Sequence, residues 1–385
     1  MIRSKGSARR LTTGRVRLIA AITAAVVMLA GFVVGFRIAL DRINSAIPQT
    51  DLFGATPGPT GTPTPERSPD GWDIKGPLNI LIAGHDMVPE IDFRQIPHSD
   101  AVMILHIDET LTHAYLTSLP RDLLVPIPAN EASGSSARSR DKLTHSLGYG
   151  ARVPGTNEQN LAQGFALLAR TVSDYTGIEH FDAGALINFG GLATLVDTIG
   201  GIDMQVDNPV TSIHRRPDGT SDEGGHGGEW MRYDVGMHHF SGWQALDYAR
   251  QRYSLPDGAH GRDRHHRQMV RAIVTKLFAY DYLGHPGSIN RILDVLGEML
   301  VLDLRGRKVT DYLYALRNLR PDSITLVGLP GGSVFSGGGS YLGEQLYPIQ
   351  AEYFAALRED GLEEFLAEHH VLVNQFIEPD IPRPM

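Results

Sequence analysis

The sequence predicts an α/β domain, a sheet covered by helices on both faces, that follows one transmembrane helix. Three observations lead to this prediction. Short apolar runs typical of buried strands alternate with stretches whose apolar residues recur at helical spacing. A stretch of 19 uncharged residues lies near the N-terminus. Strands and helices that interleave along a chain favour the α/β class.

The predicted strands are short apolar runs bounded by turn residues. The first ends at Gly84, and Asp108-Glu109-Thr110 forms a turn between the second and the third. The five runs are residues 78–83, 101–107, 113–119, 202–206 and 324–329.

Four stretches have the apolar periodicity of helices. They are residues 156–175, residues 189–199, a stretch that begins at 241, and residues 270–278. Thr156 with Gln159, and Ser241 with Gln244, are spaced as capping boxes at two of the helix starts. Gly200-Gly201 is expected to end the second helix.

The composition is that of a globular protein, because 42% of the 385 residues are hydrophobic and 21% are charged. The chain has no cysteine, which excludes a disulfide scaffold, cysteine-ligated metal sites and thiol catalysis. The formal net charge is −9, but six positive charges in residues 1–17 leave −15 on the remainder. An acidic main body argues against nucleic acid as a partner, since phosphate binding needs a basic face.

Residues 18–40 are expected to form the transmembrane helix. Leu18 to Phe36 is uncharged, and a helix of that length spans about 28 Å, close to the hydrocarbon core of about 30 Å. The basic tail 1–17 precedes it, so the positive-inside rule places the N-terminus in the cytoplasm and the main domain outside the cell. We therefore expect a single-pass protein of the cell membrane. A cleaved signal peptide is the alternative, but no convincing cleavage site follows the segment.

Residues 41–77 are expected to form a linker rich in proline, glycine and threonine, such as ATPGPTGTPTPERSPDG at 55–71. Such a composition cannot bury a core and favours an extended spacer. The domain is therefore predicted at 78–385, with its characteristic motifs in 78–280 and a closing strand and C-terminal helices in 281–385.

Six arginines lie between residues 250 and 271, against only two aspartates. So many guanidinium groups repel one another unless an anion or a carboxylate lies among them. Arg264 and Gln268 share one face near the start of the fourth helix, where unpaired N–H groups attract anions. Arg250 and Arg252 fall where the third helix ends, so both are placed to point into one cleft. The set predicts a phosphate site; the alternative is a solvated basic face with local ion pairs.

Two aspartates and one arginine lie at the ends of the predicted strands. Asp86 follows the first strand, Asp100 precedes the second, and a Pro-Arg-Asp motif with Arg121 follows the third. Mg²⁺ in proteins is usually held by one or two carboxylates together with phosphate oxygens and water. Taken singly, however, each aspartate is better explained as a turn or cap residue.

With these motifs in order, the chain resembles the LytR–CpsA–Psr family of membrane-anchored cell-wall enzymes. The motifs that carry the resemblance are NILIAGHD (79–86), HSDAVMILHID (98–108), LTSLPRDLLVPIP (116–128), KLTHSLGYG (142–150), INFGGLATLVDTIGGID (187–203), HFSGWQALDYARQR (239–252) and GRDRHHRQ (261–268). A further stretch, ITLVGLPGG (324–332), resembles the closing strand of the family.

The resemblance implies a three-layer α/β/α sandwich with a central mixed sheet and an apolar tunnel for a lipid tail. It implies a phosphotransferase that attaches a glycopolymer from a polyprenyl-pyrophosphate carrier to peptidoglycan through a phosphodiester. Asp86 and Asp100 would hold Mg²⁺ (or Mn²⁺) and, with Arg121, be the catalytic residues. The resemblance assigns the pyrophosphate to Arg121, Arg250, Arg252, Arg264 and Gln268.

One position departs from the family pattern, since His98 stands where an arginine is usual. His98 is shorter and cannot make the same two-pronged contact with phosphate, and Arg94 is placed to substitute for it. His98 stays among the pyrophosphate-binding candidates. Two other functions stay open: a non-catalytic sensor of polyprenyl phosphate that regulates envelope biogenesis, and a lipid pyrophosphatase without an acceptor.

Overall fold

The computed structural model describes residues 41–54, 73–85, 96–221, 228–280 and 287–374. The chain divides into two compact units, Met1–Ser45 and Ala46–Met385, and every helix and strand below belongs to the second. The predicted transmembrane segment 18–40 and the candidates Asp86 and Arg94 lie outside the described residues. Within the ranges above, no helix is long and apolar enough to cross a bilayer.

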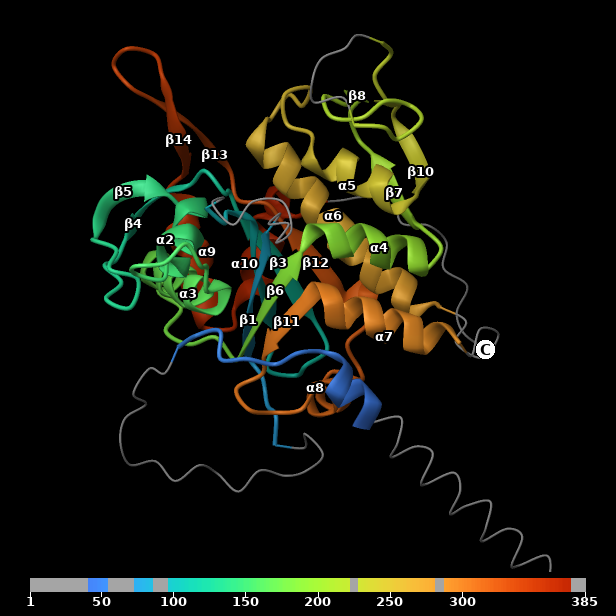
Figure 1. Ribbon diagram of the computed structural model, residues 1–385, viewed down its shortest axis with the longest axis horizontal. Helices are drawn as coiled ribbons and strands as arrows, with labels where there is room; N and C mark the ends of the chain where they lie inside the picture. Colours follow the sequence, from blue (N-terminus) through green and yellow to red (C-terminus); the bar gives the residue numbers. More distant parts are fainter. Residues whose placement is uncertain (1–40, 55–72, 86–95, 222–227, 281–286, 375–385) are drawn as a thin grey trace, which may run out of the picture. The chain divides into compact units, whose positions relative to one another are not determined.

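A six-stranded mixed sheet forms the centre of the domain (Figure 1). Its strands run in the order β11 (Leu300–Asp303), β6 (Ala183–Asn188), β1 (Leu78–His85), β2 (Ser99–Ile107), β3 (Ala114–Leu119) and β12 (Ile324–Val327). β1 is parallel to β6, and β3 is parallel to β12, whereas the other three pairs are antiparallel. The predicted α/β fold with a central mixed sheet is therefore confirmed, and four of the five predicted strands lie in this sheet.

The remaining strands form two-stranded ribbons at the periphery. The pairs are β4 (Leu124–Ile127) with β5 (Arg138–Lys142), β7 (Ile202–Val206) with β10 (Gly236–Phe240), β8 (Val210–Thr211) with β9 (Arg232–Tyr233), and β13 (Gly331–Phe335) with β14 (Tyr341–Leu346). β7 is the fifth predicted strand.

Helices cover both faces of the sheet (Figure 1). On one side lie α2 (Thr144–Ala151), α3 (Leu161–Thr176), α9 (Ile349–Arg358) and α10 (Leu362–Glu368). On the other side lie α4 (Phe189–Thr198), α5 (Gly242–Arg250), α6 (Ala259–Phe278) and α7 (Ser288–Met299). A further helix, α8 (Val309–Ala315), follows β11.

The side chains of two neighbouring residues of β3 contact helices on opposite faces of the sheet. The Thr117 hydroxyl is hydrogen-bonded to Tyr353 of α9, whereas the Ser118 hydroxyl accepts from Arg267 of α6. Successive strand side chains point to opposite faces, so each face has its own helical layer.

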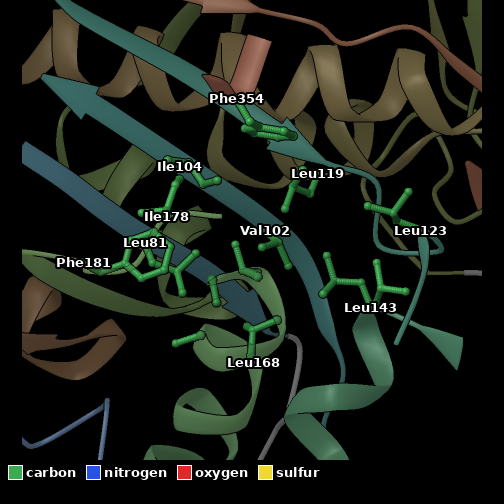
Figure 2. Packing of buried hydrophobic residues seen from close by; sticks show 14 of the residues in the cluster. Leu81, Val102, Ile104, Leu119, Leu123, Leu143, Leu168, Ile178, Phe181 and Phe354 are labelled. Atoms are coloured by element: carbon green, nitrogen blue, oxygen red, sulfur yellow. The ribbon is translucent and has the colours of Figure 1, made fainter. Parts of the chain in front are cut away.

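An apolar core lies between the sheet and the helices α3 and α9. Leu81, Val102 and Ile104 of the strands are fully buried there, together with Phe165 and Leu168 of α3. Figure 2 shows Leu81, Val102 and Leu168 in this cluster. Burying one such side chain contributes about 1.5–3 kcal/mol, so the apolar strands and the α3 stripe found in the sequence account for this layer.

Two helices begin at residues other than those predicted. α3 begins at Leu161, because the Asn160 side chain accepts from the backbone N of Gln163 (3.0 Å) and caps it; the proposed cap at Thr156 is wrong. α6 begins at Ala259, well before its apolar stripe. Its first turns carry arginine and histidine, which have no apolar period and therefore hid the helix start. The capping box at Ser241 is confirmed.

Residues 46–54, which belong to the predicted linker, pack on the domain. Leu52 is fully buried, and its backbone N donates to Oδ2 of Asp303 (2.9 Å). The Phe53 ring packs edge-on against Phe165 and stacks on Phe181. This stretch precedes the proline-rich sequence, and its apolar residues are enough to hold it to the core.

Candidate functional site

Several strands end at the same edge of the sheet and bring the sequence motifs together. β1, β3, β6 and β12 run in one direction, so their carboxyl ends meet there, and the antiparallel β2 begins there. Asp100 is the second residue of β2, and Arg121 lies two residues after β3. Ligands of α/β sheets are commonly bound at this edge.

A cavity of about 170 Å³ lies at this edge. We call it the arginine cavity, and its lining residues are Asp100, Arg121, Phe189, His214, Arg250, Arg262 and His266. Arg250 is the last residue of α5, and Arg262 and His266 lie one turn apart on α6. Three of the predicted site residues, Asp100, Arg121 and Arg250, are therefore brought together.

The charged side chains that line the arginine cavity are mostly arginines. Arg121 forms an ion pair with Asp100 through Nη1 and Oδ1, so one of the three guanidinium groups is balanced by the one carboxylate in the lining. Arginines therefore outnumber carboxylates in the lining by three to one. An anion of phosphate size is the ligand that such a space favours.

The Arg262 side chain is buried without its full set of hydrogen bonds. Only 8% of the residue is exposed, and its Nε and Nη2 have no hydrogen-bond partner. Oδ1 of Asp263, the next residue, lies 3.6 Å from Nη2. Buried N–H donors of a charged group that lack an acceptor destabilise the folded protein. A ligand that supplies an acceptor to Arg262 would remove this penalty.

His266 adds a neutral imidazole to the same wall. It is buried, and its ring lies 6.0 Å from the ring of Phe189. Burial, together with the nearby charges of Arg262, Arg267 and Arg250, lowers the pKa of His266 well below its ordinary value. His266 is therefore uncharged at neutral pH.

Arg252 is held by a separate set of side chains. It donates to Oδ2 of Asp122 (2.9 Å) and to the Tyr341 hydroxyl (3.0 Å), and its Nη2 lies 3.5 Å from Oε1 of Glu344. Lys142 also contacts Asp122, at 3.3 Å. Burial opposes the charge, but Tyr341, Asp122 and Glu344 raise the pKa of Arg252. Arg252 does not belong to the lining of the arginine cavity, although Arg250, two residues earlier, does.

Arg264 and Gln268 also lie away from the arginine cavity lining. Arg264 pairs with Asp207 and Asp257, and it lines a second cavity of about 320 Å³. Gln268 is buried, and its Oε1 has no hydrogen-bond partner. The sequence placed these two residues on one helix face, but the face that meets the arginine cavity is that of Arg262 and His266.

His98 is not part of the arginine cavity lining. The His98 ring packs edge-on against His145, 5.6 Å between centroids, and Asp86 lies outside the described residues. Sequence reasoning did not assign Arg262, His266, His214 or Phe189 to the site. The i, i+4 spacing of Arg262 and His266 was the signal that could have found two of them.

The sheet and the arginine cavity define an α/β domain with an arginine-lined cavity at the carboxyl ends of its strands. The chain belongs to the LytR_cpsA_psr family, which matches residues 59–355. The resemblance found in the motifs is thus confirmed, over most of the chain.

Individual relatives agree with this membership. The chain is 28% identical over 273 residues to Biofilm regulatory protein A of Streptococcus mutans, covering 69% of this chain but only 59% of that protein. It is 26% identical over 266 residues to "polyisoprenyl-teichoic acid–peptidoglycan teichoic acid transferase TagU" of Enterococcus faecalis, covering 68% of this chain and 75% of that protein. The fold is similar to the crystal structure of protein gbs0355 from Streptococcus agalactiae, with a TM-score of 0.57, 23% identity, and coverage of 74% of this chain and 87% of that one.

Proposed function

We propose that the protein is a membrane-anchored phosphotransferase that acts outside the cell. It attaches a glycopolymer from a polyprenyl-pyrophosphate carrier to peptidoglycan through a phosphodiester. Membership of the LytR_cpsA_psr family supports this proposal, as does the name of the TagU relative, a polyisoprenyl-teichoic acid–peptidoglycan transferase.

The observation that carries the proposal is the buried guanidinium group of Arg262. Arg262 lines one cavity with Arg121 and Arg250, and two of its guanidinium nitrogens, Nε and Nη2, have no hydrogen bond within the protein. A pyrophosphate supplies charged acceptor oxygens, so it satisfies these donors through charge-assisted hydrogen bonds. A neutral ligand offers no such charged acceptor.

The proposed reaction is an in-line displacement at phosphorus. A peptidoglycan hydroxyl oxygen bonds to the sugar-linked phosphorus, and the bond from that phosphorus to the bridging oxygen breaks. Polyprenyl phosphate leaves with the bonding electrons, and the hydroxyl proton passes to a base. Arg121, Arg250 and Arg262 are assigned to the pyrophosphate oxygens, where they stabilise the charge that grows on the leaving phosphate.

Mg²⁺ or Mn²⁺ is the proposed cofactor. The carboxylate of Asp100 fits such a cation, which takes carboxylate oxygens, phosphate oxygens and water, and Asp100 lines the arginine cavity. Asp86, the residue after β1, is the second proposed ligand. In the part of the chain that the structure describes, no three histidine or acidic side chains are grouped to hold a metal. A cation held by the two aspartates would neutralise charge on the phosphate oxygens.

The proposed location follows from the N-terminal segment. Residues 18–40 would anchor the chain in the cell membrane, with residues 1–17 in the cytoplasm and the domain outside. The carrier lipid and the peptidoglycan acceptor would then both be within reach of the domain.

The test is a transfer assay with the full chain, a synthetic polyprenyl-pyrophosphate-linked sugar, peptidoglycan and Mg²⁺. We expect polyprenyl monophosphate and a phosphodiester-linked sugar on peptidoglycan, both measured by mass spectrometry, and neither in excess chelator. Arg262→Ala should reduce both products at least tenfold, as expected for the loss of charge-assisted bonds. Arg232→Ala is the matched control, because this exposed arginine pairs with Asp234 at the surface (2.8 Å); it should keep full activity.

The same assay separates the proposal from the two other functions. Polyprenyl phosphate without any sugar on peptidoglycan would identify a lipid pyrophosphatase. Lipid binding without either product would identify a sensor.

A further inference from the structure

The ribbon formed by β13 and β14 extends away from the rest of the domain (Figure 1). Its two strands form a small sheet of their own, and residues 336–340, which join them, have the sequence SGGGS. The backbone N of Ser336 donates to the carbonyl oxygen of Ser340 (2.8 Å), and the backbone N of Gly339 donates to that of Ser336 (2.9 Å). The tip of the ribbon is therefore a closed turn with hydrogen bonds of its own.

The projecting part of the ribbon is uncharged and exposes apolar side chains. Residues 331–343 include no acidic or basic residue. Phe335 of β13 is 58% exposed and Leu342 of β14 is 42% exposed, and the Phe335 ring packs edge-on against Tyr341. Exposed apolar side chains that lie together on a projection indicate contact with another surface.

The base of the ribbon is held by the segments that carry the site. The Tyr341 hydroxyl accepts from Arg252 (3.0 Å) and donates to Oε1 of Glu344 (2.7 Å). The backbone N of Glu344 donates to the carbonyl oxygen of Asp122 (2.8 Å). Asp122 is the residue after Arg121, which lines the arginine cavity. The ribbon therefore projects from the edge of the sheet at which the arginine cavity lies.

A basic strand lies beside the base of the ribbon. This strand is β5, whose sequence RSRDK has three basic residues and one acidic residue. β5 pairs with β4, and Leu123, the residue before β4, forms a β-bridge with Glu344 of β14. Nζ of Lys142, the last residue of β5, lies 4.9 Å from the centre of the Tyr341 ring. The basic strand and the uncharged ribbon are thus parts of one surface.

The arginines of β5 are available to an anion. Arg138 and Arg140 are both exposed. Nε of Arg138 lies 3.7 Å from Oδ2 of Asp141, whereas Arg140 forms no ion pair in the part of the chain that the structure describes. The chain after residue 17 carries a net charge of −15, so an anionic surface repels most of the protein. Such a surface is approached most favourably through the basic strand.

We infer that the ribbon and β5 form a surface that docks on an anionic lipid bilayer. This inference rests on the proposed function, in which a membrane lipid carries the donor. Phe335 and Leu342 enter the boundary between headgroups and acyl chains, where apolar and aromatic side chains are favoured. Arg138 and Arg140 contact the headgroup phosphates. An uncharged apolar tip above a basic base matches a bilayer, which has hydrocarbon beneath a layer of negative charge.

Docking through the ribbon turns the arginine cavity toward the bilayer. The ribbon follows β12, whose carboxyl end lies at the same edge as those of β1, β3 and β6. The pyrophosphate of a membrane-bound donor lies at the level of the headgroups. The docked domain therefore presents Arg121 and Arg250 to the pyrophosphate while the lipid tail stays in the bilayer.

The experiment places a fluorophore at the tip of the ribbon in the full chain. The chain has no cysteine, so Gly338→Cys supplies a single labelling site, and a Cβ there would meet only Oγ of Ser336, at 3.8 Å. The chain is placed in nanodiscs of phosphatidylcholine and phosphatidylglycerol that contain a nitroxide-labelled lipid. We expect the lipid to quench this label at least about threefold more strongly than a label at Leu313→Cys. Leu313 is also exposed, but it lies on α8, at the other edge of the sheet, because β11 runs opposite to β6.

Variants of the labelled chain test the two parts of the surface. Phe335→Ser/Leu342→Ser should reduce quenching of the tip label at least about threefold, with an unchanged thermal melt because both side chains are exposed. Arg140→Gln should reduce it only when phosphatidylglycerol is present. Arg232→Gln, at an exposed arginine that pairs with Asp234, should leave it unchanged. Equal quenching of the two labels, or a double variant quenched as the parent is, would overturn the inference.

The same experiment excludes a protein as the occupant. If the tip docks on another protein or on a second copy of this chain, the labelled lipid does not quench it, and that result would also overturn the inference. Failure of the proposed function gives a different result, because Arg262→Ala would then bind inorganic pyrophosphate as the wild type does, whatever the quenching. Phe335→Ser/Leu342→Ser should keep the wild-type affinity for inorganic pyrophosphate, since neither side chain lines the arginine cavity.

Discussion

Nε and Nη2 of Arg264 both lie 2.7 Å from Oδ2 of Asp207, the residue after β7. Arg264 also pairs with Asp257, which precedes α6. The two carboxylates raise the pKa of Arg264 despite its partial burial. These contacts fix how the start of α6 is turned, and they leave Arg262 and His266 facing the arginine cavity.

Arg264→Ala should therefore lower the stability of the domain. It should not remove a direct contact with the bound anion. The change leaves the partly buried Asp207 without its arginine, and we expect the free energy of unfolding to fall by about 1–3 kcal/mol. Arg262→Ala should cost less stability than Arg264→Ala, because Nε and Nη2 of Arg262 have no hydrogen bonds to lose and its one printed ion pair, with Asp263, is 3.6 Å long. Urea unfolding of the two variants measures this difference. Equal stabilities would contradict the role given to Arg264.

Stability should fall as the pH falls below about 6.5, partly because of His266. Its pKa in the folded state is lowered by burial, so the unfolded chain takes up the proton first. The loss begins near the unfolded pKa of about 6.5 and reaches at most about 1.4 kcal/mol per pH unit for one such group. Urea unfolding between pH 7.5 and 5.5 measures the slope. His266→Gln should give a shallower slope, and an unchanged slope would show that His266 is not held neutral.

Arg252→Ala should destabilise the domain through Asp122 and Glu344. Both carboxylates are nearly fully buried, and removing one partner of a buried pair costs about 3 kcal/mol. The double variant Arg252→Ala/Glu344→Gln should recover part of this loss, since one of the stranded charges is then gone. Thermal and urea unfolding of both variants are the measurements. A double variant no more stable than the single one would mean that Glu344 does not depend on Arg252.

The boundary of the domain gives a further prediction. We propose that a chain beginning at Ala46 folds as the full domain does, because it retains Leu52 and Phe53. A chain beginning at residue 75 loses both, and each buried apolar side chain contributes about 1.5–3 kcal/mol. Thermal melts of the two shortened chains should differ clearly. Identical melting temperatures would show that residues 46–54 add nothing to the core.

Apolar period was enough to predict four of the six strands of the central sheet and the helices α3, α4, α5 and α6. β1, β2, β3 and β12 are buried on both faces, so their runs of Leu, Ile and Val stand out in the sequence. The starts of α3 and α6 were not predicted because no apolar residues mark them. The start of α3 is set by a single hydrogen bond, which the Asn160 side chain accepts from the backbone N of Gln163. The start of α6 lies among arginines and histidines, which show no apolar period.

The members of the site were harder to predict than the fold. The sequence showed that arginines gather between residues 250 and 271, but not which of them face the same space. That depends on how α6 is turned against the sheet, which the distant Asp207 helps to set. Arg250 and Arg252 are separated for a similar reason, since Arg252 is bound by Glu344 of β14, which is remote in the sequence.

The most direct test of the account is binding of geranylgeranyl pyrophosphate and of geranylgeraniol, the uncharged alcohol of the same chain length. If Arg262 binds pyrophosphate, Arg262→Ala should weaken the first ligand about tenfold or more, the loss expected for charge-assisted hydrogen bonds. Its affinity for the alcohol should stay within about twofold. Arg262→Lys should recover only part of the loss, because an ammonium lacks the planar two-pronged contact, and Arg232→Ala should bind as the wild type does. An Arg262→Ala chain that melts normally and binds the pyrophosphate lipid as tightly as the wild type would contradict the account.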